Sequence, residues 1–586
     1  MNKLKSLKKK KKKYVIIFSI VAVSLVSFSF VEDYYFEVSK NLDIFTTAYR
    51  NVNIYYVDSI QPGELMEKGI NSMLKTLDPY TVYIPESDIE DYKMTHISAE
   101  YGGIGALVHE RNNEIEVSEV YEGFPAQKGD IRPGDKIMSV NGISVANKEV
   151  GDVTEFLKGA KGSKVSLTVK REGEEKPIEK NLYRDEIKFK NVPFSGMVSP
   201  NTGYIRLNQF LEDAGEEVGS AFSALKENPA MKYLVLDLRG NGGGLLKEAV
   251  EIVNLFVDKG EKIVSQKGKV REMNMEYIAA KQPLDVQIPI AVLVDKGSAS
   301  AAEIVTGALQ ELDRGVVVGQ RTFGKGLVQQ TYPMSYNTLL KVTIAKYYTP
   351  SGRCIQALDY AHRTNTGIAG HHVDSLLKEF KTKNGRSVYD GSGVYPDVYL
   401  EQEQFSNISS ALAMNYLIFD FANAYFRKHP GIDSASSFRL SDADFAEFTK
   451  WLVDKKYDYT NRSENKLDDL KKAAEKEKYF SSLESEFNNL KKKMAEEKKM
   501  DIKNNSEEIR EILEAEIVSR YYFESGALQS NFKYDKELKK AIEVLNDNKT
   551  YSSILNGEGA YKVIGKPGTT EQALTGSESE DWGEKN

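Results

Sequence analysis

Two serines lie at a predicted strand-to-helix corner, where a hydroxyl could act as a nucleophile. The apolar run 291–294 predicts a buried strand, and Ala301 opens a segment whose apolar residues have helical spacing. Ser298 and Ser300 occupy the small-residue turn between the two. A hydroxyl at such a corner is accessible, and the first free N–H of a helix can stabilise a developing oxyanion. The alternative is that either serine only caps the helix, which is the commoner role for serine at that position.

Lys325 is the candidate for the general base that a serine nucleophile requires. It stands among small and apolar residues in the segment 319–329, whereas none of the six histidines falls in either segment. A lysine can accept the serine proton only if burial lowers its pKa enough to leave the amine neutral. Gln329 follows four residues later in a predicted strand, so its side chain is placed to orient the amine from the same face.

Two further lysines are candidate bases on composition alone. Lys341 and Lys346 belong to the alternating segment 339–348, which predicts a half-buried strand. Both fall on charged faces of that strand, so we expect both to be solvated.

Both segments resemble motifs of the carboxyl-terminal processing (tail-specific) serine proteases. The matching stretches are Gly-Ser-Ala-Ser-Ala-Ala-Glu at 297–303 and Phe-Gly-Lys-Gly-x-Val-Gln at 323–329. The resemblance implies that Ser300 is the nucleophile, that Lys325 is the base and that Gln329 positions Lys325. One local difference is alanine at position 302, where many relatives have a serine that is not catalytic.

A glycine-rich loop, Arg-Gly-Asn-Gly-Gly-Gly at 239–244, lies between a predicted buried strand and a helical segment. Glycines let backbone amides approach a substrate closely. The loop lacks the third glycine of a dinucleotide fingerprint, and the phosphate-loop pattern ending at Lys325 lacks the Ser or Thr that must follow it. The resemblance implies instead that the N–H groups of Gly244 (or its neighbour Gly243) and of Ala301 form an oxyanion hole.

Residues 97–185 have the pattern of a PDZ domain. Gly103, Ile104 and Gly105 resemble the loop whose backbone N–H groups bind the terminal carboxylate of a peptide. The strand that follows would pair with the bound peptide by β-augmentation. Pro-Gly-Asp and Asn-Gly turns come later, in the order typical of the domain. The alternative is a β-rich linker domain that binds no ligand.

The amino terminus has the pattern of an export signal. Eight of the first 13 residues are lysine, and an uncharged apolar run follows at 14–30. The run has 17 residues, a length between that of a signal-peptide core and the about 20 residues that a membrane-spanning helix needs. We therefore predict an exported protein of the periplasm or cell envelope. Its first 30 residues are either cleaved as a signal peptide or kept as an inner-membrane anchor.

Composition excludes several other classes. The chain has 586 residues and a net charge of −7, and no basic patch beyond its start indicates nucleic-acid binding. Cys354 is the only cysteine, which rules out an intrachain disulfide and a cysteine-rich metal site. The pair His371 and His372 falls in a polar insertion and favours a surface loop over a metal centre. We expect no metal and no cofactor.

The predicted fold class is a mixed, multidomain α/β protein. The resemblance implies a β-rich PDZ domain and an α/β protease core of crotonase-like, tail-specific protease type, between amino-terminal helices and a carboxyl-terminal helical extension. The predicted divisions are 1–30 (signal peptide or anchor), 31–96 (helical), 97–185 (PDZ), 186–400 (protease core, with an insertion at about 355–392), 401–555 (charged helices) and 556–586 (disordered tail).

The charged helices are the part of the chain that the resemblance does not cover. Residues 405–430 predict one apolar-rich helix, and 464–548 are dense in Lys, Glu and Leu at helical spacing. We expect their apolar stripe to pack on the core or on a partner, as an adaptor surface or a homo-oligomer contact.

The resemblance implies a serine endopeptidase with a Ser–Lys dyad. Its substrates would be proteins or peptides with free carboxyl termini, held by the PDZ domain. The alternative is an inactive or partner-gated PDZ scaffold in the cell envelope, although Ser300, Lys325 and Gln329 are all present.

Overall fold

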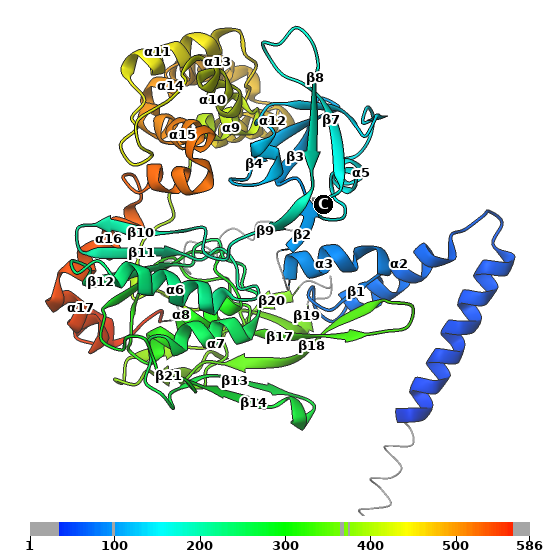
Figure 1. Cartoon of the computed structure of the whole chain (residues 1–586), viewed down its shortest axis with the longest axis vertical. Helices are drawn as coiled ribbons and strands as arrows, with labels where there is room; N and C mark the ends of the chain where they lie inside the picture. Colours follow the sequence, from blue (N-terminus) through cyan, green and yellow to red (C-terminus); the bar gives the residue numbers. More distant parts are fainter. Residues whose placement is uncertain (1–33, 97–99, 364–368, 373–375, 567–586) are drawn as a thin grey trace, which may run out of the picture. The chain divides into compact units, whose positions relative to one another are not determined.

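The structure is a computed structural model that describes residues 34–96, 100–363, 369–372 and 376–566 (Figure 1). The predicted signal segment at 1–30 lies outside these residues. Among the described helices, none is both long enough and apolar enough to span a membrane. The chain divides into two compact units, Met1–Pro85 and Glu86–Asn586.

The first unit contains helices, as predicted for this part of the chain. Residues 34–55 are helical, and α2 (Pro62–Lys75) begins with proline in its first turn, where the missing N–H is not needed. Leu74 is its buried residue. After the helix, Asp78 accepts the N–H groups of Tyr80 and Thr81, each at 2.8 Å, and so forms the turn that leads to β1 (Val82–Ile84).

The predicted PDZ domain is an antiparallel sheet closed by helix α5. Its strand order is β3-β4-β5-β7-β8, with β6 paired to β5, and β3 is an edge strand that pairs with β4 alone in this sheet. Helix α5 packs against β3, and a separate pair, β2 with β9, joins the two ends of the domain. The elements are β2 (Glu100–Gly103), β3 (Ala106–Arg111), β4 (Glu114–Val120), α4 (Pro125–Lys128), β5 (Lys136–Val140), β6 (Ile143–Ser144), α5 (Val150–Leu157), β7 (Lys164–Lys170), β8 (Ile178–Tyr183) and β9 (Asp185–Lys188).

The predicted protease core is built on a mostly parallel sheet in the order β10-β11-β12-β15-β16-β23. Only β10 runs antiparallel to its neighbour. Parallel sheets require cover on both faces, and the strand residues alternate accordingly between two apolar clusters. The strands are β10 (Phe194–Ser199), β11 (Thr202–Arg206), β12 (Tyr233–Asp237), β15 (Ile290–Val294), β16 (Val316–Gly319) and β23 (Val398–Tyr399).

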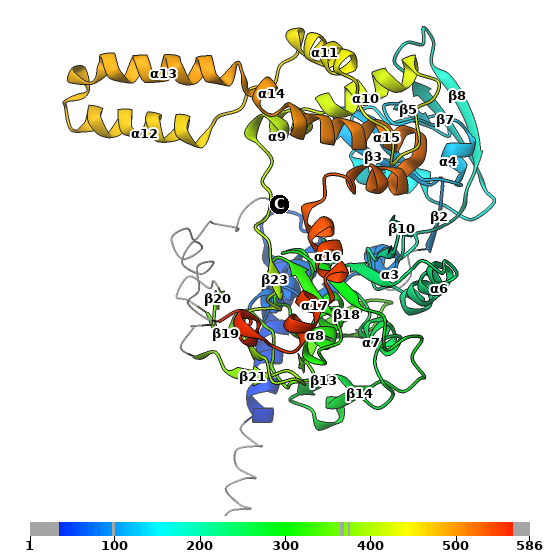
Figure 2. The same ribbon diagram turned by 90° about the vertical axis from the view of Figure 1, so that its left-hand side faces the viewer.

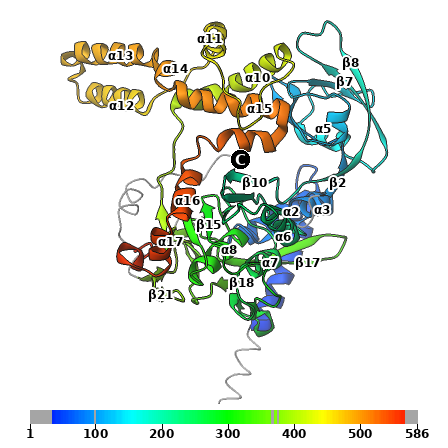
Figure 3. The ribbon, with the colours of Figure 1, turned by 60° about the vertical axis from the view of Figure 1, so that its left-hand side comes forward.

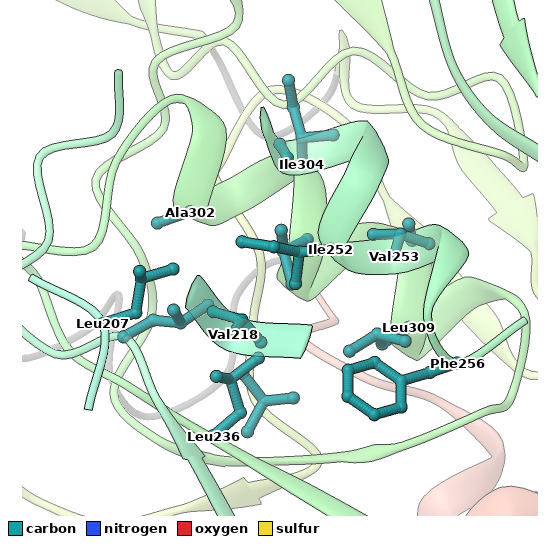
Figure 4. Packing of buried hydrophobic residues seen from close by; sticks show 14 of the residues in the cluster. Leu207, Val218, Leu236, Ile252, Val253, Phe256, Ala302, Ile304 and Leu309 are labelled. Atoms are coloured by element: carbon teal, nitrogen blue, oxygen red, sulfur yellow. The ribbon is translucent and has the colours of Figure 1, made fainter. Parts of the chain in front are cut away.

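One face of this sheet is covered by helices α6 (Ala214–Lys226), α7 (Leu246–Asn254) and α8 (Ala301–Glu311). Leu236 of β12 packs there with Ile252 and Val253 of α7 and with Ile304 of α8 (Figure 4). This cluster fixes the start of α8 against the carboxyl ends of the strands, where α/β proteins place their sites.

The other face is covered by residues from the far end of the chain. Helix α16 (Lys536–Asn546) lies beside the sheet (Figure 3). Its Leu538 and Val544 pack with Val235 and Leu293 of the sheet. Of the two packing partners expected for the apolar stripe of the charged helices, the core or another protein, α16 packs on the core, and α17 (Asn548–Leu555) joins it there. The apolar stripe of α16 is buried against this second face of the sheet.

The remaining carboxyl-terminal helices form a separate apolar cluster drawn from α9, α10, α11 and α15. The predicted single helix at 405–430 is two helices, because Tyr416 takes a left-handed backbone with φ 59°. Helices α12 and α13 pack side by side as a hairpin (Figure 2). Their bounds are α9 (Asn407–Met414), α10 (Leu417–Lys428), α11 (Asp442–Trp451), α12 (Arg462–Lys476), α13 (Glu484–Lys498), α14 (Asp501–Asn504) and α15 (Ser506–Asn531).

A second, antiparallel sheet carries the segment that follows the candidate base. Strand β18 pairs with β17 and with β13, and β13 pairs with β14. The strands are β13 (Lys262–Gly268), β14 (Met275–Ile278), β17 (Leu327–Pro333) and β18 (Leu339–Tyr348).

The insertion at about 355–392 is more than the predicted surface loop. It contains the pairs β19 (Leu358–Arg363) with β20 (Ala369–His371) and β21 (Glu379–Lys381) with β22 (Ser387–Tyr389). Its Arg386 is fully buried and forms ion pairs at 2.6 Å with Asp313 and Asp397, which anchor the insertion to the core.

Residues 556–566, which were predicted to belong to a disordered tail, are packed against the core. The Ile564 side chain is buried, and its N–H donates to the carbonyl of Ser387 at 2.9 Å. The part of the chain that the structure describes continues to residue 566.

Candidate active site

Ser300 stands at the sharp corner between β15 and α8. Its backbone has φ 55° and ψ −114°, a conformation that costs a residue with a side chain about 1–3 kcal/mol. The neighbouring contacts impose it: the Ser300 N–H donates to Glu303 at 2.9 Å, and the Ala299 N–H donates to the carbonyl of Asn241 at 2.9 Å. Ser300 is half-buried and is the N-cap residue of α8.

Ser298 has a different role from Ser300. Its side chain is fully buried, and its hydroxyl donates to the carbonyl of Leu238 at 2.8 Å while accepting the Asp295 N–H at 3.0 Å. These bonds hold the corner together and occupy the hydroxyl. Of the two serines, it is therefore Ser300 that is left to face a substrate.

A cavity of about 520 Å³ brings the predicted catalytic residues together. Ser300 and Ala301 enter it from the start of α8, and Gly243 and Gly244 line it from the glycine-rich loop. The segment before β17 and β17 itself contribute Lys325 and Gln329. Every residue that was predicted to take part in hydrolysis thus lies on one wall or another of the same cavity.

The glycine-rich loop packs directly against the corner that contains Ser300. A Cβ added to Gly243 would lie 2.7 Å from the Ser300 Cβ and 2.9 Å from the Ala301 nitrogen. Gly243 and Gly244 have φ values of +98° and +147°, which glycine adopts without strain. Only glycine allows the loop to come this close.

Hydrogen bonding separates the two glycines that were predicted as alternative oxyanion donors. The Gly243 N–H already donates to the Asn241 side chain at 2.8 Å. The N–H groups of Gly244 and Ala301 have no acceptor among the residues that the structure describes. Both remain available beside the Ser300 side chain, so Gly244 is the better candidate of the two.

Buried side chains hold this loop in place. The carboxylate of Asp237 is fully buried and binds Arg239 and Arg206. Burial alone would raise the pKa of Asp237, but Arg239 and then Arg206 hold it below its usual range. Arg239 also pairs with Asp535 at 2.6 Å, which ties the loop to the segment before α16. The N–H of Gly240, the next residue of the loop, donates to the Asp295 carboxylate at 2.8 Å.

Glu303 is the functional candidate that the sequence reasoning missed. Its fully buried carboxylate accepts the N–H of Ser300 at 2.9 Å, the N–H groups of Gly324 and Lys325 at 2.8 Å each, and the Thr322 hydroxyl at 2.5 Å. Burial raises its pKa to about 7. One side chain therefore fixes the backbones of both the serine and the lysine segment. The available signal was a glutamate three residues after a candidate N-cap, which is the capping-box position.

A second link between the two segments comes from Tyr347 of β18. Its hydroxyl contacts the carbonyl oxygen of Ser300 at 3.1 Å and also donates to the carbonyl of Lys325. The Lys325 side chain is half-buried. Gln329 extends from β17 and donates to the Thr343 hydroxyl at 3.2 Å. The lysine and the glutamine thus belong to a framework that is tied to the serine corner.

The PDZ carboxylate loop lies in its own domain. Its backbone carbonyls are used: Ile104 accepts the Ala126 N–H at 2.7 Å, and Gly105 accepts the Tyr121 N–H at 3.0 Å. In the described part of the chain, the N–H groups of Ile104 and Gly105 donate to no acceptor. Gly103 ends β2, and the Ile104 side chain is buried in the domain core, so the loop presents backbone rather than side chains.

Comparison with known proteins agrees with this domain arrangement. Residues 94–170 match the PDZ domain family, 201–366 match peptidase family S41, and 408–545 match the C-terminal helical domain of a probable PDZ-protease. A carboxy-terminal-processing protease of Bartonella bacilliformis is 36% identical over 322 residues, which cover 54% of this chain and 73% of the relative. The chain belongs to peptidase family S41. The predicted family, the fold class and the function as a carboxyl-terminal processing serine protease are confirmed at this level.

Other members of the S41 group are similarly related. The carboxy-terminal processing protease CtpA of Bacillus subtilis is 36% identical over 317 residues, covering 54% of this chain and 67% of the relative. The solved structure of a photosystem II D1 C-terminal processing protease is 26% identical, covers 61% of this chain and 92% of that chain, and has a TM-score of 0.33.

One expectation about the S41 core is wrong. Lys346 is exposed as predicted, but Lys341 is half-buried and lines the cavity that contains Ser300. Its ammonium lies 5.6 Å from the ring centroid of Tyr92, and burial lowers its pKa. The strand pattern could not show this, because the ring that covers Lys341 comes from α3 (Ile89–His96), far away in the sequence.

Proposed function

We propose that Ser300 and Lys325 form the nucleophile and base that cleave peptide bonds in this protease. The amine of Lys325 accepts the Ser300 hydroxyl proton as the oxygen attacks the substrate carbonyl carbon. The N–H groups of Gly244 and Ala301 stabilise the oxyanion that forms. Gln329 orients the Lys325 amine.

The remaining steps use the same two residues. The Lys325 ammonium returns its proton to the leaving amine as the peptide C–N bond breaks, which leaves an ester on Ser300. Lys325 then deprotonates a water molecule, which attacks the ester carbonyl. The ester breaks, a product with a new carboxyl terminus is released, and the serine hydroxyl is restored by the proton held on Lys325.

The observation that carries this proposal is that a single cavity is lined by Ser300, Lys325, Gln329 and the two unpaired N–H groups. The buried carboxylate of Glu303 supports it, because it binds the backbones of the serine and of the lysine at once. A purely structural serine would need neither a facing lysine nor two spare amide donors.

The PDZ domain is proposed to hold the carboxyl terminus of the substrate. The free N–H groups of Ile104 and Gly105 would bind the terminal carboxylate, and Gly103 lets the chain approach them. The substrate would extend along β3, whose outer edge has no partner strand in the sheet of the PDZ domain.

The lysine-rich and apolar start of the chain supports a proposal of export, with residues 14–30 as a cleaved signal or an anchor in the cell envelope. Helices α12 and α13 are proposed as the surface for an adaptor or a second copy, since they extend from the helical cluster as a charged hairpin.

Digestion of an unfolded protein tests the proposed chemistry. The full-length chain without substitutions should cleave it. Ser300→Ala should remove cleavage because no other hydroxyl takes the place of the nucleophile. Ser220→Ala, at an exposed position of α6, is the matched control and should cleave normally. Equal cleavage by Ser300→Ala and the full-length chain would refute the assignment and favour a scaffold role.

A further inference from the structure

Lys341 occupies the active-site cavity without a part in the proposed hydrolysis. It pairs with Thr331 across the β17–β18 hairpin, and Gln329 pairs with Thr343. Side chains two residues apart on a strand share a face, so Lys341 rises from the same face as Gln329, two pairs further along. The hairpin thus presents both to the cavity.

In the part of the chain that the structure describes, the ammonium of Lys341 has no counter-ion. Within the described residues, no carboxylate is close enough to form an ion pair with it and no acceptor receives a hydrogen bond from it. It lies over the face of the Tyr92 ring, with its nitrogen 5.6 Å from the ring centroid. That ring is held in turn by a 2.6 Å hydrogen bond between the Tyr92 hydroxyl and Thr331. The charge is therefore held in position, but it is not neutralised.

The rest of the described cavity lining offers no negative charge. Its charged residues are Lys325 and Lys341, and the others are apolar or uncharged polar residues such as Asn208 and Gln209. Because Lys325 has to be neutral to act as a base, the positive charge of the cavity resides on Lys341. A half-buried cation that lacks a partner is best complemented by an anion brought in by the ligand.

We propose that Lys341 forms a subsite for a carboxylate of the substrate beside the scissile bond. This inference rests on the proposed function of the same cavity. The carboxylate comes from an Asp or Glu side chain near the cleaved bond or from the terminus of a short peptide. In either case it replaces the hydration that Lys341 has lost, and it offsets the effect of burial on the ammonium.

Matched peptides test the subsite. A neutral peptide that the enzyme cleaves is remade with Glu in place of Gln at each position flanking the bond, and each version is made as a free acid and as an amide. The full-length enzyme should prefer one acidic version by about 10- to 100-fold in kcat/KM, the value of a hydrogen bond to a charged group. A preference for internal Glu identifies a side-chain ligand, and a preference for acid over amide identifies a terminal one.

Three variants assign that preference to Lys341. In Lys341→Gln the ratio should fall to about 1, whereas Lys341→Arg should keep most of it. Lys346→Gln, which removes an exposed lysine from the same strand, should keep the full ratio.

Three results would overturn the inference. They are an active full-length enzyme with no preference at any position, a Lys341→Gln variant that keeps the preference, and a Lys341→Gln variant that slows equally on all peptides. The first needs no variant to fold. Failure of the proposed function is a different result, because Ser300→Ala would then cleave the neutral peptide as well as the full-length enzyme does.

Discussion

Two loops in this chain are proposed to direct backbone N–H groups toward an anion, and they are held in different ways. The catalytic loop at 239–244 is held by buried side chains, among them Asp237 with its arginine partners and the Asn241 amide. The PDZ loop at 103–105 is held chiefly through its own carbonyls, which accept N–H groups from within the domain.

This difference matches the two kinds of charge that the loops are proposed to meet. The oxyanion exists only during the reaction, so its donors must be oriented in advance and cannot move toward it at low cost. A substrate carboxylate is present throughout binding, so a loop supported by backbone contacts is sufficient. Changes to the first loop should therefore lower kcat, and changes to the second should raise KM.

The largest expected effect is that of Gly243→Ala. The new Cβ would meet the Ser300 Cβ at 2.7 Å and the Ala301 nitrogen at 2.9 Å, so it would displace the serine and an oxyanion donor together. We expect kcat to fall by about 1000-fold or more, the upper range for loss of one such donor. Gly242→Ala is the matched control, because nothing lies within 4 Å of its added Cβ. Similar steady-state rates for the two variants would contradict the account.

The second prediction concerns the titration of Glu303. Its pKa in the folded protein is raised to about 7, so the folded state binds more protons than the unfolded state between about pH 5 and 7. The free energy of unfolding that Glu303 contributes should therefore decrease as the pH rises, by about 3 kcal/mol in all. Urea unfolding of the full-length chain and of Glu303→Gln across this range measures it. A difference between the two that does not change with pH would show that Glu303 is ionised throughout.

The smallest expected effect is that of Gly105→Ala in the PDZ loop. Gly105 has φ +75°, and its added Cβ would lie 2.4 Å from the Phe124 side chain, so the loop must shift. We expect KM for a tailed protein substrate to rise about 10-fold, the loss of one hydrogen bond to a charged group, with kcat little changed. Gly151→Ala, in α5 with open space around it, is the control. A fall in kcat without a rise in KM would remove the distinction between the loops.

The parts that could be predicted from the sequence are those written in short segments. Ser300 and Lys325 stand in local patterns of small residues, and the turns of the PDZ domain follow each other in a recognisable order. The apolar run 291–294 likewise predicted the buried strand that is found as β15.

The parts that were missed depend on contacts between distant segments. Glu303 gains its role from Thr322, Gly324 and Lys325, which only the folded core brings to it. Lys341 looks solvated until the Tyr92 ring is placed over it. Local periodicity could not decide that α16 packs on the sheet rather than on a partner, and it could not show that Arg386 is buried.

The most direct test of the account is the cleavage of an unfolded protein by Ser300→Ala, by Lys325→Ala and by the double variant. If the two residues act as one unit, each single variant should lose as much kcat/KM as the double variant does, since either loss disables the same step. Substantial turnover by Lys325→Ala would contradict this, and it would show that another group in the cavity takes the proton from Ser300.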